Sequence, residues 1–338
     1  MHVNGLQWLK NPFQGMKFAK TTPLIVVFTI FGYTLFAQGA SQDSITKKET
    51  LNKGNHYTQW VSFAHINDLF RLDGVSDRYF SFGHQLDYLR NIKSNKKEDR
   101  SLYYTIGLNF EGYTPEYDLE IIDSSTTRPF AAWSYITLGF TDNKPNRYLK
   151  YEFEVGYIGP KARGKEIQNW VHKQISKNPE VIGWSEQIDN QIGINFSLDY
   201  RKTIIQTGKH TLLAGSEQKL GNVYTFLWPS ISYQFNGKAK NGYLPFQYAA
   251  SGSSNFTVEA NIGFKYEFFN ITIEGEPSSE IFEPLKDEVI YSGLFTAGLG
   301  VRYHFRNFSI YFSNNYNSKR VQSNHDHIYG VMGLSYSW

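Results

Sequence analysis

Residues 256–268, "FTVEANIGFKYEF", alternate apolar and polar side chains without interruption. In an extended strand, successive side chains point to opposite faces, so this pattern gives the strand one apolar and one polar side. The apolar face would carry Phe256, Val258, Ala260, Ile262, Phe264, Tyr266 and Phe268. A strand of about 9–11 residues crosses a bilayer when tilted, so this segment is long enough to span a membrane.

The same period recurs along the chain, for example in "LKYEFEVGY" at 149–157 and "IGINFSLDY" at 192–200. The pattern predicts an all-β, transmembrane antiparallel β-barrel of about twelve strands. The strands are expected at 57–67, 79–91, 101–112, 130–142, 148–158, 190–202, 208–218, 222–236, 254–270, 289–304, 306–317 and 327–338. A soluble sheet with one solvent-exposed face would give a similar alternation. The strand lengths and the aromatic residues on the apolar faces favour the barrel.

The sequences at the two ends of the chain also support an outer-membrane barrel. Lys17 and Lys20 precede an apolar run at 23–36, followed by "AQGAS", which is the layout of a secretory signal peptide. We therefore expect an extension and signal peptide at 1–40, a flexible lead-in at 41–55 and the outer-membrane barrel at 56–338. The last segment, "YGVMGLSYSW", ends on an aromatic residue as barrel strands do, although a soluble β-protein could also end on Trp338.

Charge and composition exclude some classes of partner. Three lysines and no acid lie in residues 1–40, so the net charge of +3 falls to about zero without them. A neutral chain has no general attraction for nucleic acid, and none is expected as a partner. There is no cysteine, which excludes a disulfide framework.

Long polar connections at 68–78, 113–129, 159–189, 237–253 and 271–288 are expected to be outer loops, with short periplasmic turns at 143–147 and 305–307. Within 159–189 the period changes to that of a helix over 165–176. Its apolar stripe is expected to comprise Ile167, Trp170, Val171 and Ile175. His172 lies beside this stripe, where it would face the seam between helix and barrel.

Several polar residues at the expected outer rim could work with His172. The first strand ends in "HIND", which places Asn67 and Asp68 there, and the next begins near Ser81. A histidine, a carboxylate, an amide and a hydroxyl at one rim suggest an ester hydrolase that activates water with the histidine as base. A hard cation with oxygen ligands would polarise the carbonyl. A solvated surface histidine is the simpler alternative.

Four stretches resemble the outer-membrane lipid A 3-O-deacylase family. They are "NDLF" at 67–70, "SDRYFSFG" at 76–83, "RPFAAW" at 128–133, and "GPKARGKEIQNWVH" at 159–172 followed by "GWSEQ" at 183–187. The resemblance implies a calcium-dependent hydrolase that removes the 3'-linked acyl chain from lipid A in the outer membrane. The site would lie in a groove between the barrel wall and the loop helix, facing the outer leaflet. A monomer with lipopolysaccharide as its partner is expected.

The resemblance also assigns roles residue by residue. His172 matches the catalytic base, Asn67 and Asp68 match an Asn-Asp pair at the calcium site, and Ser81 matches a hydroxyl position. Glu180 is a further candidate for the metal, next to Asn178 and Pro179, which compete for that alignment. Arg128 and Gln168 are expected at the substrate, with packing as the alternative for Arg128.

The chain departs from the family in two places. Leu69 stands where a second acid can occur, and residues 116–123, "EYDLEIID", are acidic where at least one member is basic. The second difference puts the form of the substrate in question. Hydrolysis of phospholipids or other acyl lipids, or a non-enzymatic barrel, are the alternative functions. His325, Asp326 and His327 could bind a metal but are expected to form a polar loop.

Overall fold

The computed structural model describes residues 58–68, 79–95, 100–115, 128–176, 179–181, 183–237, 255–275 and 288–338. The expected extension and signal peptide at 1–40 and the lead-in at 41–55 lie outside these residues. None of the described helices is both long and apolar enough to span a membrane.

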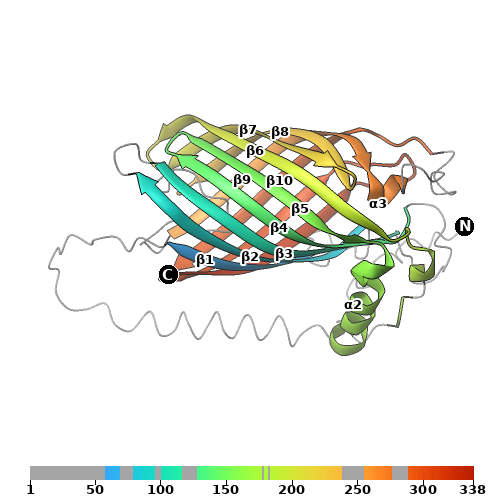
Figure 1. The fold of residues 1–338 in the computed structure, drawn as a ribbon. Helices are drawn as coiled ribbons and strands as arrows, with labels where there is room; N and C mark the ends of the chain where they lie inside the picture. Colours follow the sequence, from blue (N-terminus) through green and yellow to red (C-terminus); the bar gives the residue numbers. More distant parts are fainter. Residues whose placement is uncertain are drawn as a thin grey trace, which may run out of the picture. The chain divides into compact units, whose positions relative to one another are not determined.

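Twelve antiparallel strands form a closed barrel in which each strand pairs with its neighbours in sequence (Figure 1). They are β1 (Gln59–Asn67), β2 (Tyr79–Asn95), β3 (Arg100–Thr114), β4 (Ala131–Lys144), β5 (Arg147–Ile158), β6 (Gln191–Thr207), β7 (His210–Gly221), β8 (Tyr224–Phe235), β9 (Asn255–Asn270), β10 (Gly293–Phe305), β11 (Phe308–Asn317) and β12 (His327–Ser337). Pairing of β1 with β12, from Trp60 with Ser337 to Asn67 with Gly330, closes the ring. The predicted fold is confirmed.

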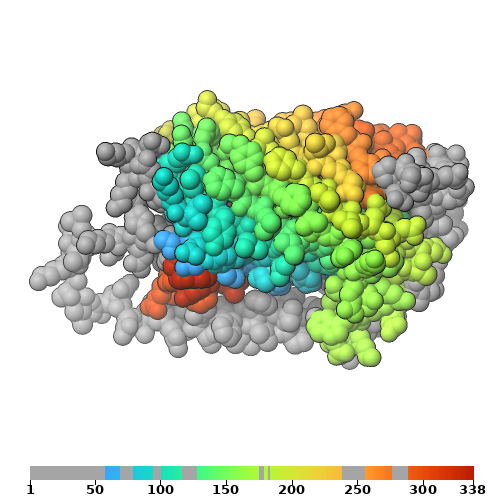
Figure 2. Space-filling model, viewed as in Figure 1, coloured from blue at the N-terminus to red at the C-terminus, as the bar shows by residue number. Residues whose placement is uncertain are grey.

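The side chains divide into an apolar outside and a polar inside. On β3, the outward Ile106 and Leu108 are 45% and 56% exposed, whereas the inward Thr105 is buried. Neighbouring strands place their outward residues side by side, because Ile106 of β3 pairs with Leu138 of β4 and Leu108 with Ile136. In Figure 2, β3 to β6 form an unbroken wall on the face shown. This is the surface expected of a protein surrounded by lipid.

Most connections at one rim are long and most at the other are short. The exceptions are the short connection 222–223 at the first rim and the long connection 236–254 at the second. We call the rim with the connections 68–78, 115–130, 159–190, 271–292 and 318–326 the loop rim. At the opposite turn rim, strands are joined at 96–99, 145–146, 208–209 and 306–307. The prediction that 237–253 shares a rim with the other long loops was wrong, because β8 ends and β9 begins at the turn rim. Antiparallel strands alternate in direction, so every connection after an even-numbered strand lies there.

The helix predicted at 165–176 is present but changes type. α2 (Gly164–Val171) is α-helical, and His172–Ser176 continue it as a π-helix. Residues Glu166–Val181 belong to a compact unit that is distinct from the barrel. The residues on either side, up to Lys165 and from Ile182, belong to the barrel unit. In the predicted apolar stripe, Trp170 is 58% exposed, and docking of the stripe on an apolar surface stays a prediction.

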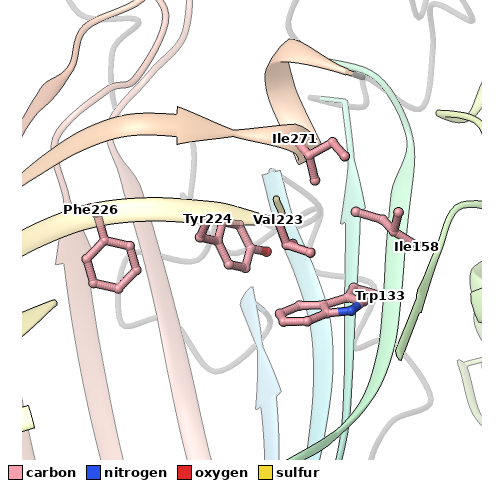
Figure 3. Close-up of a cluster of buried hydrophobic side chains, with 6 residues drawn as sticks. All are labelled: Trp133, Ile158, Val223, Tyr224, Phe226 and Ile271. Carbon is pink, nitrogen blue, oxygen red and sulfur yellow. The ribbon is translucent and has the colours of Figure 1, made fainter. Parts of the chain in front are cut away.

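An apolar cluster fills the barrel interior near the loop rim. Its members come from three strands, the turn between β7 and β8, and α3 (Ile271–Glu274), and they are Trp133, Ile158, Val223, Tyr224, Phe226 and Ile271. Figure 3 shows Ile158, Val223 and Ile271 gathered around the Trp133 indole. Trp133, Ile158, Val223 and Ile271 are fully buried.

Polar contacts cross the lumen beside this cluster. The hydroxyl groups of Tyr113 on β3 and Tyr224 on β8 lie 2.8 Å apart, and both donate to Glu111, at 2.7 and 2.8 Å respectively. Five positions separate β3 and β8 around a ring of twelve, so the bond from Tyr224 to Glu111 joins nearly opposite walls. Lys219 on β7 also donates to Glu154 on β5 at 2.7 Å. The lumen is therefore bridged near the loop rim.

A bridged lumen predicts the absence of a permanent pore. Purified protein in planar lipid bilayers is expected to show no steady conductance above that of protein-free bilayers, while a general porin reconstituted in parallel conducts. Large, long-lived open states at low voltage would contradict this expectation and favour the non-enzymatic channel.

Candidate functional site

The polar residues predicted at the ends of β1 and β2 lie together at the loop rim. Phe63 is 46% exposed and faces outward, so Asn67, two pairs of residues further along β1, faces outward as well. Asn67 pairs with Phe82 of β2, and Asp68 and Ser81 are the next residues beyond this pair. The Asp68 side chain is fully buried. The structure thus brings Asn67, Asp68 and Ser81 to one place.

A third strand contributes a hydroxyl that the sequence interpretation missed. Ser81 and Thr114 of β3 form a short hydrogen bond between their side-chain oxygens, and both residues are buried. A register shift between Phe80 and Phe82 marks an irregularity of β2 at Ser81. The alternation along β3 places Thr114 on the outward face. Its hydrogen bond to Ser81, however, depends on the register shift in β2. Sequence spacing alone gave no signal for the pair.

Two histidines lie directly below Asn67 on the outer wall. His65 and His84 are cross-strand partners with their Nδ1 atoms 3.4 Å apart and their rings stacked at 4.9 Å. Phe63 stacks on the other side of His84 at 6.1 Å. His65, His84 and Phe63 thus pack against one another next to the candidate site.

The long connection after β5 is anchored to β4 at its base. The Gly159 N–H donates to the Ala132 carbonyl at 3.0 Å, and the Ser134 hydroxyl donates to the Ala162 carbonyl at 2.9 Å. Gly159 has a φ of 85°, and a Cβ there would lie 2.5 Å from the Asp189 carbonyl oxygen. Only glycine therefore fits this crossing of the two ends of the connection.

His172 is held by a hydrogen bond within its own unit. Its Nδ1 lies 2.7 Å from the carbonyl oxygen of Pro179, and a carbonyl can only accept. Nδ1 therefore carries the proton, and the lone pair of the neutral ring is on Nε2. The residue also opens the π-helical segment, a distortion that is frequent at functional sites. The sequence predicted the residue but not the carbonyl that orients it.

The two other candidates of this unit have different surroundings. Gln168 on α2 is buried, at 6% exposure, whereas Glu180 is exposed. Asn169 accepts a hydrogen bond from the Val181 N–H at 2.9 Å, which ties the helix to the segment that follows it. The roles of Gln168 at the substrate and Glu180 at a metal stay predictions.

Arg128 points into the barrel. Its Nη2 donates to the carbonyl and hydroxyl oxygens of Thr272 on α3, at 3.0 and 2.7 Å, and its guanidinium lies 4.4 Å from the centre of the Tyr113 ring. Burial lowers the pKa of Arg128 to about 10, which leaves it charged at neutral pH. Through these contacts Arg128 has a packing role inside the barrel. Its contact with substrate stays a prediction.

The remaining cluster at this rim, His325, Asp326 and His327, makes contacts with its own loop and with β2. Asp326 accepts from the Tyr316 hydroxyl at 2.7 Å and from the Lys319 N–H at 2.9 Å. The His327 ring packs edge-on against Tyr79. Within the described part of the chain, no group of three or more histidine, cysteine or acidic residues is arranged to hold a metal ion.

Comparison with known proteins identifies the family. The model of the family described as "Outer membrane protein LpxR" matches residues 24–338. The chain belongs to the LpxR family. This membership confirms the resemblance found in the sequence and places the barrel in the outer membrane. No curated protein sequence matches.

One solved structure shows the same fold, and two further barrels are less similar. LpxR from Salmonella typhimurium superposes with a TM-score of 0.71 at 16% identity, covering 82% of this chain and 100% of that one. The β domain of the Bordetella autotransporter BrkA gives a TM-score of 0.48 at 12% identity, covering 83% and 99%. The translocator domain of NalP from Neisseria meningitidis gives 0.43 at 12% identity, covering 94% and 98%.

The Arg128 contacts predict a measurable coupling with Thr272. Replacing Arg128 by Met should lower the free energy of unfolding by about 2–4 kcal/mol, because it breaks buried charge-assisted hydrogen bonds. In a double-mutant cycle with Thr272→Val, the coupling energy should be about 1 kcal/mol or more. Urea unfolding in detergent measures both. Additive effects would show that the pair does not stabilise the barrel.

Proposed function

We propose that this protein is an outer-membrane ester hydrolase that removes the 3'-linked acyl chain of lipid A, with His172 as the base that activates water. The single observation that carries the proposal is the 2.7 Å hydrogen bond between His172 Nδ1 and the Pro179 carbonyl. It fixes the tautomer that a general base needs. Family membership supports the substrate class.

The chemistry of His172 follows from this tautomer. Nε2 accepts a proton from water, and the hydroxide formed attacks the ester carbonyl. The imidazolium that results keeps its Nδ1–H bond to Pro179, so the ring stays in place while it carries the charge. It can then donate the Nε2 proton to the departing alkoxide. A histidine near neutral pH is suited to both steps.

The outward position of Asn67, with Ser81 beside it at the loop rim, suits a lipid substrate. Lipid A lies in the outer leaflet with its acyl chains against the barrel surface. A polar patch on the outer wall, directly above exposed apolar side chains such as Phe63, meets an acyl ester at the depth where chain joins headgroup. The ester need not leave the membrane to be hydrolysed.

The oxygen donors at the end of β1 suit a hard cation such as Ca²⁺. We propose that the Asp68 carboxylate and the Asn67 amide oxygen hold it, and the role of Glu180 at the metal stays a prediction. Asp68 is a buried carboxylate at the rim, and a buried charge of this kind is normally paired or bound to a metal. When bound, the cation would polarise the ester carbonyl and stabilise its oxyanion.

The same arrangement could hydrolyse other acyl lipids. The observation that favours this second candidate is the acidic sequence at 116–123, which would repel a heavily phosphorylated headgroup approaching that loop. A phospholipid carries one phosphate, so this repulsion would be weaker for it. Cells given both substrates would separate the two activities.

Loss of His172 should abolish hydrolysis. His172→Ala and His172→Gln are expected to lower kcat by about 10²–10⁴-fold, the usual contribution of a general base. The measurement is the mass spectrum of lipid A from cells that express each variant. His210, an exposed histidine at the turn rim, gives the matched control His210→Gln. Folded wild-type protein that leaves lipid A unchanged in the presence of Ca²⁺ would contradict this substrate.

Hydrolysis should also depend on a divalent cation held by Asp68. Chelation is expected to stop the wild-type enzyme, and added Ca²⁺ should restore it. Asp68→Asn should raise the Ca²⁺ concentration needed for half-maximal activity by at least tenfold, because an amide is a weaker ligand than a carboxylate. Calcium-dependent thermal stabilisation measures binding independently of activity. Equal calcium responses in Asp68→Asn and wild type would exclude Asp68 as a ligand.

A further inference from the structure

The start of the connection after β5 carries three basic residues on the outer wall. Lys161, Arg163 and Lys165 are all exposed, and we call residues 161–165 the basic turn. They belong to the barrel unit, so their position on the wall is defined. Among the described residues, no ion pair neutralises any of the three.

The backbone of the basic turn is fixed rather than loose. The Lys161 N–H donates to Asn190 Oδ1 at 2.6 Å, and the Ala162 carbonyl accepts from the Ser134 hydroxyl at 2.9 Å. Ala162 is buried, while Arg163 adopts a left-handed conformation with φ 65° that ends the short 3-10 helix. The turn therefore presents its charged side chains from a rigid base, which lowers the entropy lost on binding.

The basic turn lies at the depth of lipid headgroups. Tyr157, at the end of β5, faces outward and is 48% exposed. The Lys161 ammonium lies 5.6 Å from the centre of its ring. Aromatic residues mark the membrane interface in barrels, and a lysine above one extends its charge into the headgroup layer.

The other described basic residues of the barrel unit at the loop rim are already engaged. Arg128 and Arg320 point inward to Thr272 and Glu267, and the Lys319 ammonium donates to the Gln322 carbonyl at 2.9 Å. The connection after β3 has four acids and no base between 116 and 123. The positive charge available to an outside ligand is thus concentrated at the basic turn.

We propose that the basic turn binds a phosphate group of the lipid substrate headgroup, with Lys161 and Arg163 as its principal contacts. This proposal rests on the proposed function and names the part of the substrate that fixes its orientation. The guanidinium of Arg163 can bind two phosphate oxygens at once, and Lys161 adds a point charge. The turn is three strands from β2, roughly 14 Å along the wall. The phosphate bound there would be distinct from the ester presented to Asn67 and Ser81.

The test compares lipid A with its enzymatically dephosphorylated form in nanodiscs. For wild type, kcat/KM is expected to favour the phosphorylated lipid, and this preference should shrink as salt rises. In Lys161→Gln/Arg163→Gln the ratio of the two kcat/KM values should fall about tenfold, and in Lys161→Glu/Arg163→Glu it should fall further. The matched control Lys209→Gln removes an exposed lysine at the turn rim and should keep the wild-type ratio. An unchanged ratio in both double variants would overturn the proposal.

A binding experiment separates this proposal from the proposed function. Purified His172→Ala protein, with and without the two substitutions, is titrated with nanodiscs of either lipid. Tighter binding of the phosphorylated lipid that needs Lys161 and Arg163 would support the basic turn even if wild type hydrolyses neither. If the enzyme hydrolyses lipid A but binds both lipids equally, the proposal for the basic turn is overturned and the proposed function is not. Displacement by inorganic phosphate at matched ionic strength would indicate a site for the free anion and count against a headgroup site.

Discussion

The structure depends on the need to satisfy every backbone N–H and C=O inside a solvent that offers no hydrogen bonds. A sheet in lipid can meet this need only by closing on itself, and the β1–β12 pairing does so over eight residue pairs. Closure fixes which side of each strand meets lipid and which meets the lumen. The alternation of apolar and polar residues then sets the orientation of the side chains along the regular strands, including that of Asn67.

Closure also separates two kinds of chemistry. Inside, Glu111 and the tyrosine hydroxyl groups bridge the lumen, and the Trp133 cluster fills the space beside them. Outside, the polar residues at the loop rim lie at the edge of an apolar wall. A filled interior makes the outer face the accessible one for a substrate that lives in the membrane. The proposed function of the basic turn uses that face.

Much of the fold could be predicted from the sequence because lipid and lumen impose opposite preferences on alternate residues. Residues 256–268 show that contrast at every position, and β9 is found there. The rim of the connection between β8 and β9 was wrong because loop length was used where strand direction decides. Asn67, Asp68 and Ser81 were found because they end or begin strands. Their shared location then follows from pairing.

Other parts of the candidate site could not be predicted, because they depend on contacts between distant segments. Thr114 reaches Ser81 through an irregularity in β2, and Arg128 turns inward to a short helix near residue 272. The carbonyl that fixes His172 comes from Pro179, beyond the π-helical residues that break the helical period. Such contacts leave no spacing signal in the chain.

The hydrogen bond from Tyr224 to Glu111 has a consequence for how the protein reaches this state. It joins residues 113 positions apart, whereas each hairpin of the sheet joins near neighbours. Contacts between residues that are distant in sequence form only after the intervening chain is placed. Hairpins can therefore assemble early during insertion, while the lumen seal must wait until β3 and β8 face each other. Before that step the inserting chain would enclose an open, hydrated passage, and completion of folding would restore the permeability barrier of the membrane.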